Sequence, residues 1–233
     1  MKSPLFILIE TTADLCSVAI SDDKGILAAS KSLLKYDHAS KLTLLIEQAR
    51  QMAGIALKDV SAISISLGPG SYTGLRVGMS TAQALAMSLS IPLIGIPTLE
   101  AIAFKCASKH NFKPGKYIPM IDARRMEVYT MTFNEKMQAI GDAKALILDE
   151  DSIQTEIGQS DFVCFSGNGA FKVKSFLEVK EHVLIDIEEL SASDLHGLTL
   201  HNYQQKKFLN IFLAQPIYIK QPNITTPKPR LKA

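Results

Sequence analysis

Residues 64–89 read SISLGPGSYTGLRVGMSTAQALAMSL and set the expected architecture. An apolar segment typical of a strand leads through a glycine-rich turn into a segment typical of a helix, the order found in phosphate-binding enzymes. Gly68 and Gly70 would let the backbone approach a ligand closely, and the first N–H groups of the helix would face an anion. A tight strand-to-helix turn that needs glycine for its own geometry explains the same letters. The stretch alone leaves both interpretations open.

The letters of this loop match no standard nucleotide-binding fingerprint. After Gly68 and Gly70, the third glycine of a dinucleotide-binding loop would fall at residue 73, which is Thr73. No Lys-Ser or Lys-Thr pair follows the glycines, so the P-loop pattern is absent as well.

The segments around this loop predict an α/β fold. Three strands are expected at residues 5–10, 15–21 and 26–34, followed by a helix over 39–54 that Gly54 ends. A strand at 60–67, a helix over 74–90 and a strand at 91–96 complete the order βββαβαβ.

The second half of the chain repeats this order in a weaker form. Strands are expected at 117–122 and 126–133, with a third short strand near Gln138, and residues 162–177 again read as strand, glycine turn and helix. We therefore expect an α/β protein with two ribonuclease-H-like subdomains and mixed sheets, the second subdomain degraded. The expected boundaries are 1–97, 98–215, and a C-terminal segment with a basic tail at 216–233.

Composition places the chain among ordinary globular proteins. Its 233 residues are 47% hydrophobic and 21% charged, and the net charge of +2 is too small to indicate a nucleic-acid binder. The apolar run at 5–9 is cut by Glu10 and is too short for a signal peptide, and no segment reaches the length of a membrane span. We expect a cytoplasmic protein that does not contact the membrane.

Cysteine and histidine spacing indicates no metal site. Cys16, Cys106 and Cys164 are scattered without CxxC spacing, so neither a disulfide framework nor a thiolate metal site is expected. The five histidines offer no conventional ligand pair, and no serine lies in a G-x-S-x-G nucleophile elbow. These histidines are His38, His110, His182, His196 and His201.

Several stretches resemble the TsaB (YeaZ) family, a component of bacterial tRNA threonylcarbamoylation within the superfamily of actin, hexokinase and acetate kinase. The most specific are GPGSYTGLR at 68–76 and DARRMEVY at 122–129. The others are ILIETT, CSVAI, HASKL, IPLIGIPTLEAIA, SGNGA and PIYIK, so the resemblance spans most of the chain. Glu10 departs from the usual pattern, since an Asp is common there.

The resemblance implies that catalytic metal chemistry is missing. The related protein TsaD holds a metal with two histidines four residues apart on the helix after the strand that matches IPLIGI. The corresponding positions here are Thr98 and Ile102, and neither side chain replaces an imidazole. The chain resembles an inactive homologue of the M22-type metalloproteases, and we expect no activity from it alone.

Glu10 and Asp122 end the first expected strand of each half, where the superfamily holds metal-nucleotide phosphates. The resemblance therefore groups them with the loop glycines Gly68 and Gly70. These four residues are the candidate vestigial nucleotide site; simple turn roles remain an equal alternative. For Asp122, a structural pairing with Arg124 is favoured. We expect no cofactor to be required by this chain itself.

The two helices of the first half carry apolar residues over more than one face, which predicts contact with another protein. The expected interface residues are Leu45, Ala49, Met79, Ala82, Ala86 and Leu89. The resemblance implies TsaD as the partner on this surface, with TsaE and ATP joining the complex and homodimers reusing the same surface. It implies contact with tRNA only indirectly, through the complex.

The expected function is therefore that of a non-catalytic partner of TsaD in making N6-threonylcarbamoyladenosine next to the tRNA anticodon. The alternative is an enzyme in its own right, either a kinase of the superfamily or a glycoprotease-like metalloprotease. The missing histidine pair argues against the protease, and the absent phosphate fingerprint argues against the kinase.

Overall fold

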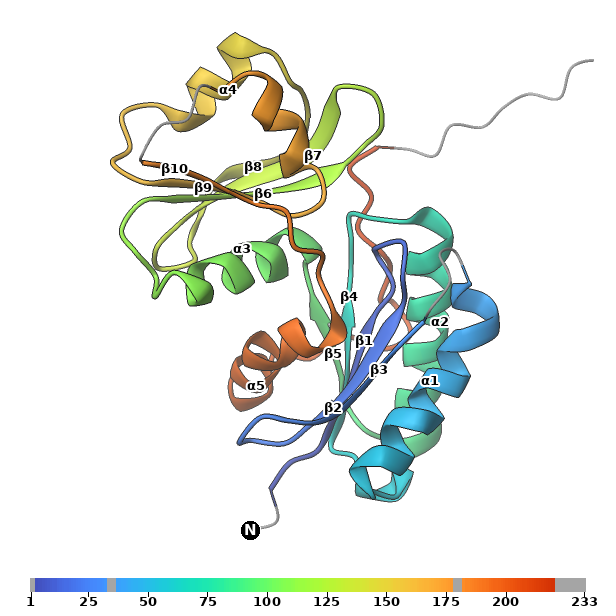
Figure 1. Ribbon diagram of the computed structural model, residues 1–233. Helices are drawn as coiled ribbons and strands as arrows, with labels where there is room; N and C mark the ends of the chain where they lie inside the picture. Colours follow the sequence, from blue (N-terminus) through green and yellow to red (C-terminus); the bar gives the residue numbers. More distant parts are fainter. Residues whose placement is uncertain (1–2, 33–36, 178–181, 221–233) are drawn as a thin grey trace, which may run out of the picture.

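The computed structural model describes residues 3–32, 37–177 and 182–220, and within them the strands form two five-stranded sheets (Figure 1). The first sheet has the order β3-β2-β1-β4-β5, with β1, β2 and β3 antiparallel and β4 and β5 parallel to β1. Its strands are β1 (Phe6–Glu10), β2 (Ser17–Ser21), β3 (Ile26–Lys31), β4 (Ala62–Ser66) and β5 (Leu93–Ile96).

The second sheet repeats this arrangement with the order β10-β9-β6-β7-β8, in which β6, β7 and β8 are antiparallel and β9 and β10 are parallel to β6. Its strands are β6 (Lys116–Asp122), β7 (Glu127–Asn134), β8 (Ala139–Ile147), β9 (Val163–Ser166) and β10 (Val183–Asp186). The predicted duplication and mixed sheets are confirmed.

The second half differs from the sequence prediction in its details. The short strand expected near Gln138 is the nine-residue β8, and the expected helix after β9 is the short 3-10 helix η2 (Ala170–Ser175). Residues 142–159, for which no element was expected, contain α4 (Glu150–Ile157), where Asp149 caps the first turn by accepting from the Ser152 N–H. Residues 33–34 of the third predicted strand and the basic tail lie outside the described residues.

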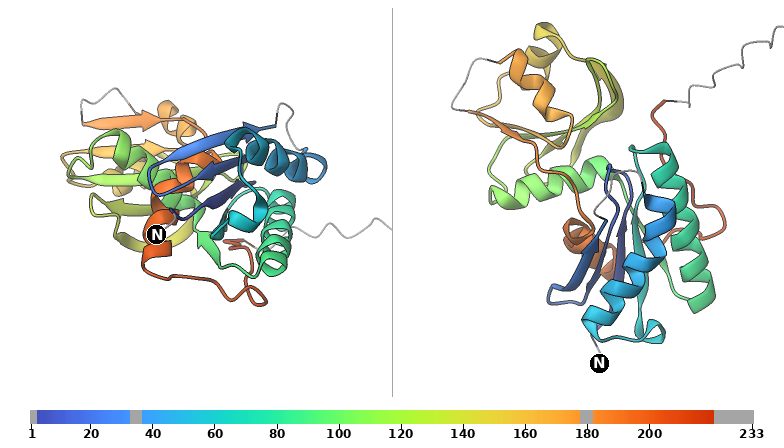
Figure 2. Two further views of the ribbon diagram at one scale, coloured as in Figure 1. Left: turned by 90° about the horizontal axis from the view of Figure 1, so that it is seen from below. Right: turned by 45° about the vertical axis from the view of Figure 1, so that its right-hand side comes forward.

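Helices cover both faces of the first sheet (Figures 1 and 2). On one face lie α1 (His38–Ala53) and α2 (Tyr72–Leu89), which pack against each other. On the other lie η3 (Ala192–Leu195) and α5 (His196–Gln204). The α1–α2 side therefore forms one outer face of the molecule.

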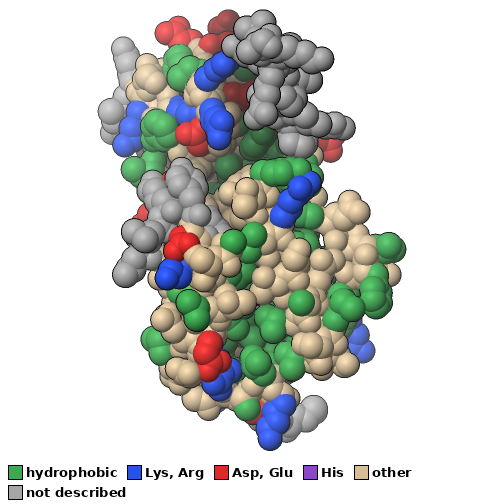
Figure 3. All heavy atoms as spheres, turned by 90° about the vertical axis from the view of Figure 1, so that its right-hand side faces the viewer, with side chains coloured by type: hydrophobic (Ala, Val, Ile, Leu, Met, Phe, Trp, Pro, Cys, Tyr) green, Lys and Arg blue, Asp and Glu red, His purple; other side chains and the backbone are tan. Residues whose placement is uncertain are grey.

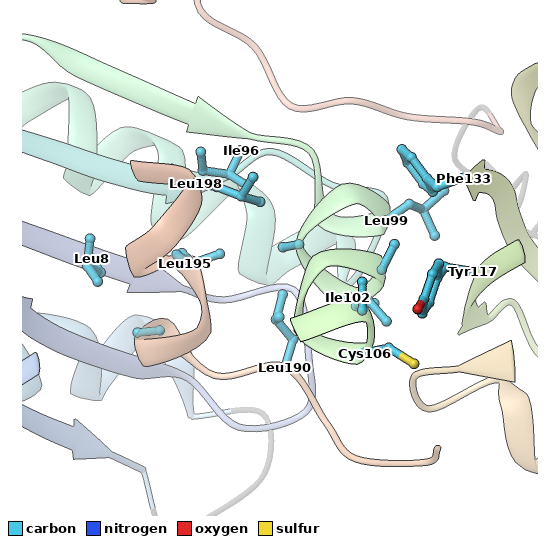
Figure 4. Packing of buried hydrophobic residues seen from close by; sticks show 14 of the residues in the cluster. Leu8, Ile96, Leu99, Ile102, Cys106, Tyr117, Phe133, Leu190, Leu195 and Leu198 are labelled. Carbon is cyan, nitrogen blue, oxygen red and sulfur yellow. The ribbon is translucent and has the colours of Figure 1, made fainter. Parts of the chain in front are cut away.

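Helix α3 (Thr98–Lys109) lies between the two sheets and joins the halves through a shared core. Leu99 and Ile102 point from α3 toward Tyr117 and Phe133 of the second sheet (Figure 4). On the other side of this core, Leu195 and Leu198 pack against Leu8 and Ile96 of the first sheet. Because this apolar core is continuous, the two halves form one packed unit.

The chain returns to the first sheet after α5. The Leu209 N–H donates to the carbonyl oxygen of Leu93 at 2.8 Å, and the Ile217 N–H donates to that of Leu67 at 2.8 Å. Gln83 of α2 holds the intervening loop through the carbonyl oxygens of Ile211 (2.7 Å) and Ala214 (3.1 Å). Residues 192–217 pack on the first sheet. The subdomain boundaries expected from the sequence stay a prediction.

The expectation of no disulfide is wrong. Cys106 of α3 and Cys164 of β9 are joined by a disulfide, with their Cα atoms 7.4 Å apart and a sequence separation of 58. Cys16 is free and buried. A pairing made by tertiary structure over this distance leaves no spacing signal in the sequence. Among the described helices, none is long and apolar enough to cross a membrane.

Candidate functional site: the glycine-rich loop and the cleft

The glycine-rich loop between β4 and α2 is tied down by hydrogen bonds on both sides. The Gly68 N–H donates to Thr98 Oγ1 at 2.9 Å, and the Thr98 N–H donates back to the Gly68 carbonyl oxygen at 2.9 Å. The Ser71 N–H donates to the Thr12 carbonyl oxygen at 2.9 Å, and Ser71 Oγ accepts from the Gly74 N–H at 3.2 Å as the N-cap of α2. The N–H groups of residues 68, 71 and 74 are therefore engaged within the protein.

The loop glycines permit close packing against the turn after β1. A Cβ atom on Gly70 would lie 2.5 Å from the Thr12 Cβ and 2.7 Å from the Thr12 carbonyl oxygen, and one on Gly74 would collide with the Thr11 carbonyl oxygen. The space that a phosphate would need is thus filled by residues 11–12. This geometry supports the tight-turn interpretation of the loop.

Glu10 ends β1 and is fully buried. Its carboxylate accepts hydrogen bonds from the backbone N–H and the hydroxyl of Thr12. Burial raises the pKa of the Glu10 carboxyl, while the hydrogen bonds from Thr12 act in the opposite direction. Glu10 therefore holds the β1 turn in shape, as Asp and Glu at strand ends often do.

Asp122 ends β6, at the position equivalent to Glu10. Asp122 Oδ1 accepts from Lys172 Nζ at 2.6 Å and from the Arg124 N–H at 2.6 Å. Arg124 thus contacts Asp122 through its backbone, and the charged partner is Lys172, whose side chain is 5% exposed. The role of Lys172 is not visible in the sequence, because its approach to Asp122 depends on how η2 packs against β6, β9 and β10.

The space between the two halves is small. It holds a cavity of about 20 Å³, lined by Thr12, Ala13, Thr98, Ile102, Ile121, Asn168, Glu189 and Leu190. A volume of this order suits about one water molecule, whereas small-molecule sites span roughly 300–1,000 Å³. The residues present therefore do not fit a nucleotide, and none of the four predicted nucleotide-site residues lines the cavity.

Thr98 and Ile102 do face this cleft from α3, the helix on which the resemblance to TsaD places metal ligands. The Thr98 hydroxyl is already bonded to Gly68, and Ile102 is 6% exposed in the core between the halves. Both positions serve packing and loop attachment here.

The six predicted interface residues lie mostly in the core of the first half. Leu45, Ala49, Met79, Ala82 and Ala86 are at most 5% exposed and pack beneath the helices, and Leu89 is half-buried. The small residues Ala82 and Ala86 allow α2 to approach its own sheet closely. A partner interface on α1 and α2 stays a prediction, and any such contact falls on the outward residues of these helices.

The face that α1 and α2 form exposes hydrophobic side chains (Figure 3). Helix α1 also carries Lys41, Glu47 and Arg50. Arg76 is the single charged residue in the 18 residues of α2. Leu44 and Met52 of α1 and Met87 of α2 are 54%, 67% and 50% exposed. Exposed apolar side chains on and beside a helix with little charge are typical of a protein contact surface.

Comparisons with known proteins agree with this fold. Residues 31–193 match the family model described as TsaD: tRNA N6-adenosine threonylcarbamoyltransferase. The chain is similar to the tRNA threonylcarbamoyladenosine biosynthesis protein TsaB of Escherichia coli, with 27% identity over 91% of this chain and 93% of that protein. It is also similar to the protein of that name from Buchnera aphidicola subsp. Acyrthosiphon pisum, with 32% identity over 66% of this chain and 70% of the relative.

The solved structure of YeaZ from Pseudomonas aeruginosa has the same fold. It superposes with a TM-score of 0.77 at 23% identity, covering 94% of this chain and all of that chain.

Proposed function

The chain belongs to the TsaB (YeaZ) family of tRNA threonylcarbamoyladenosine biosynthesis proteins, and we propose that it acts in that pathway as a non-catalytic partner of TsaD. In this role it binds TsaD through the outward face of α1 and α2, in a complex that TsaE and ATP join. Contact with tRNA is indirect, through TsaD. The cytoplasm is the compartment in which this reaction takes place.

The observation that carries the proposal is the small size of the cavity between the two halves. In this fold a substrate would lie between the two halves, and there the cavity of about 20 Å³ is lined on the α3 side by Thr98 and Ile102. Neither a nucleotide nor a metal held by those two side chains fits this arrangement. It supports neither an independent kinase nor a metalloprotease.

The outward face of α1 and α2 supports the partner role. It exposes Leu44, Met52 and Met87, and Arg76 is the single charged residue of α2. Burial of α2 against a second protein therefore desolvates few ionic groups. The same face on two copies of this chain can form a self-complementary contact, and homodimers in the absence of TsaD are part of the proposal.

The test is reconstitution from purified components. The chain alone should hydrolyse neither ATP nor peptides. It should co-elute with TsaD of the same cell in size-exclusion chromatography, and tRNA modification should require both proteins. Turnover by the chain alone, or full tRNA modification by TsaD and TsaE without it, would contradict the proposal.

A further inference from the structure

Three metal-ligating side chains lie together where α3 ends against β9. The ligand atoms of Cys106, His110 and Cys164 are all within 4.8 Å of one another. Both cysteines are buried, and the Cys106 sulfur points from α3 toward the second sheet (Figure 4). We propose that, once the disulfide is reduced, these three side chains bind one thiolate-preferring metal ion such as Zn²⁺.

The local structure holds the three ligands in place without a metal. Cys106 and His110 are four residues apart at the end of α3, so their side chains lie on one face of the helix. The His110 N–H donates to the carbonyl oxygens of Cys106 (3.2 Å) and Ala107 (3.1 Å), which fixes its backbone. Cys164 lies on β9, between β6 and β10 in the sheet. A metal would therefore find a largely preformed site.

His110 supplies an independent indication of a ligand. Its Nε2 atom is buried and has no hydrogen-bond partner among the described residues. Buried polar side-chain atoms are nearly always hydrogen-bonded, because an unmet group loses its interaction with water. A metal ion bound through this nitrogen and the two sulfurs would satisfy it.

The distance between the two cysteine backbones also suits a metal. Their Cα atoms are 7.4 Å apart, beyond the range of roughly 4.4–6.8 Å that is usual for disulfides. An ion with bonds of about 2.3 Å to each sulfur spans a longer gap than a direct sulfur–sulfur bond. Two thiolates and an imidazole are a ligand set that zinc accepts, with the fourth tetrahedral position left to water.

The disulfide and the metal exclude each other chemically. A dithiol reductant breaks the sulfur–sulfur bond by supplying two electrons and two protons, and it becomes a cyclic disulfide itself. The metal ion then displaces the two thiol protons, which pass to solvent. The site lies further along α3 than Thr98 and Ile102, so it is separate from the position at which the resemblance to TsaD places a metal.

The experiment uses Co²⁺ as a spectroscopic probe of the full-length protein, reduced with a dithiol that is then removed under inert gas. We expect one equivalent of Co²⁺ to bind with a thiolate-to-cobalt charge-transfer band. The band should be absent from the oxidised protein and from Cys164→Ser, and His110→Ala should weaken binding by roughly tenfold or more. Cys16 is the third cysteine of the chain and lies buried outside this cluster. Cys16→Ser should therefore leave Co²⁺ binding unchanged.

Two results would overturn the proposal. One is reduced wild-type protein, with all three thiols confirmed by titration, that shows no thiolate-to-cobalt band. The other is His110→Ala that remains folded by circular dichroism and binds Co²⁺ as tightly as the wild type. Comparing Co²⁺ binding by the oxidised and the reduced wild-type protein tests the proposal even if a cysteine variant fails to fold.

Discussion

Gly68 and Thr98 are joined by two hydrogen bonds of 2.9 Å. The Gly68 N–H donates to Thr98 Oγ1, and the Thr98 N–H donates to the Gly68 carbonyl oxygen. The pair fastens the loop after β4 to the first residue of α3. It also occupies a loop N–H group that an anion would need. Thr98 therefore has a structural role at a position where the resemblance to TsaD places a histidine.

Replacing Thr98 with Val should destabilise the protein. The change keeps the side-chain shape but leaves the buried Gly68 N–H without its acceptor, which costs about 1–3 kcal/mol. Urea unfolding followed by circular dichroism measures this loss. Thr98→Ser keeps the hydroxyl and should unfold close to the wild-type midpoint; equal stability of the Val variant would show that the bond contributes little.

Glu10→Gln should alter how stability depends on pH. The pKa of Glu10 in the folded protein is raised above the ordinary value of 4.5, so above that pH the folded state binds more protons than the unfolded state. The free energy of unfolding of the wild type therefore falls as the pH rises from 4.5 through the raised pKa of Glu10. This loss is absent below pH 4.5.

The variant lacks this ionisation, so its stability relative to wild type should improve between pH 4 and pH 8, by about 1.4 kcal/mol per unit of raised pKa. Parallel urea titrations at several pH values test this, because all other groups titrate alike in both proteins. A stability difference that is constant with pH, or that moves in the opposite direction, would refute the assignment.

Lys172→Met should weaken the second half of the molecule. Lys172 Nζ lies 2.6 Å from Asp122 Oδ1 and also donates to the Glu127 carbonyl oxygen at 2.9 Å. Its loss removes the charged partner of Asp122 and one of the two donors to each acceptor, leaving only the backbone N–H groups of Arg124 and Ala123. Because Asp122 is 35% exposed and recovers some hydration, the expected cost is about 1–3 kcal/mol. Lys174→Met, at an exposed position two residues away, is the matched control and should change the unfolding free energy little.

The repeated strand order was predictable because it rests on local signals. Alternating apolar runs and polar turns mark the first two strands of each half, and the apolar–glycine–helix pattern marks the crossover. The strand β10 and the length of β8 escaped prediction, since β8 is exposed along most of its length and lacks an apolar run.

The site was harder to predict because burial and pairing are tertiary properties. Ala82 and Ala86 are equally consistent with packing against a partner or against their own sheet, and the structure shows the second. The Cys106–Cys164 pair and the Lys172–Asp122 pair join residues 58 and 50 positions apart, where no sequence spacing indicates contact. The absence of a nucleotide fingerprint, by contrast, is visible in the letters of the loop.

Binding of TsaD by α2 variants at two neighbouring positions tests the central claim most directly. Met87 is 50% exposed and Ala86 is fully buried, so Met87→Glu should remain folded, whereas Ala86→Glu buries an unpaired charge and should lower the melting temperature sharply. Ile147→Glu places the same charge at a position of the second sheet that is 66% exposed, and serves as the control. In size-exclusion chromatography, Met87→Glu should lose the TsaD complex and Ile147→Glu should keep it. A folded Met87→Glu variant that binds TsaD as tightly as the wild type would contradict the account.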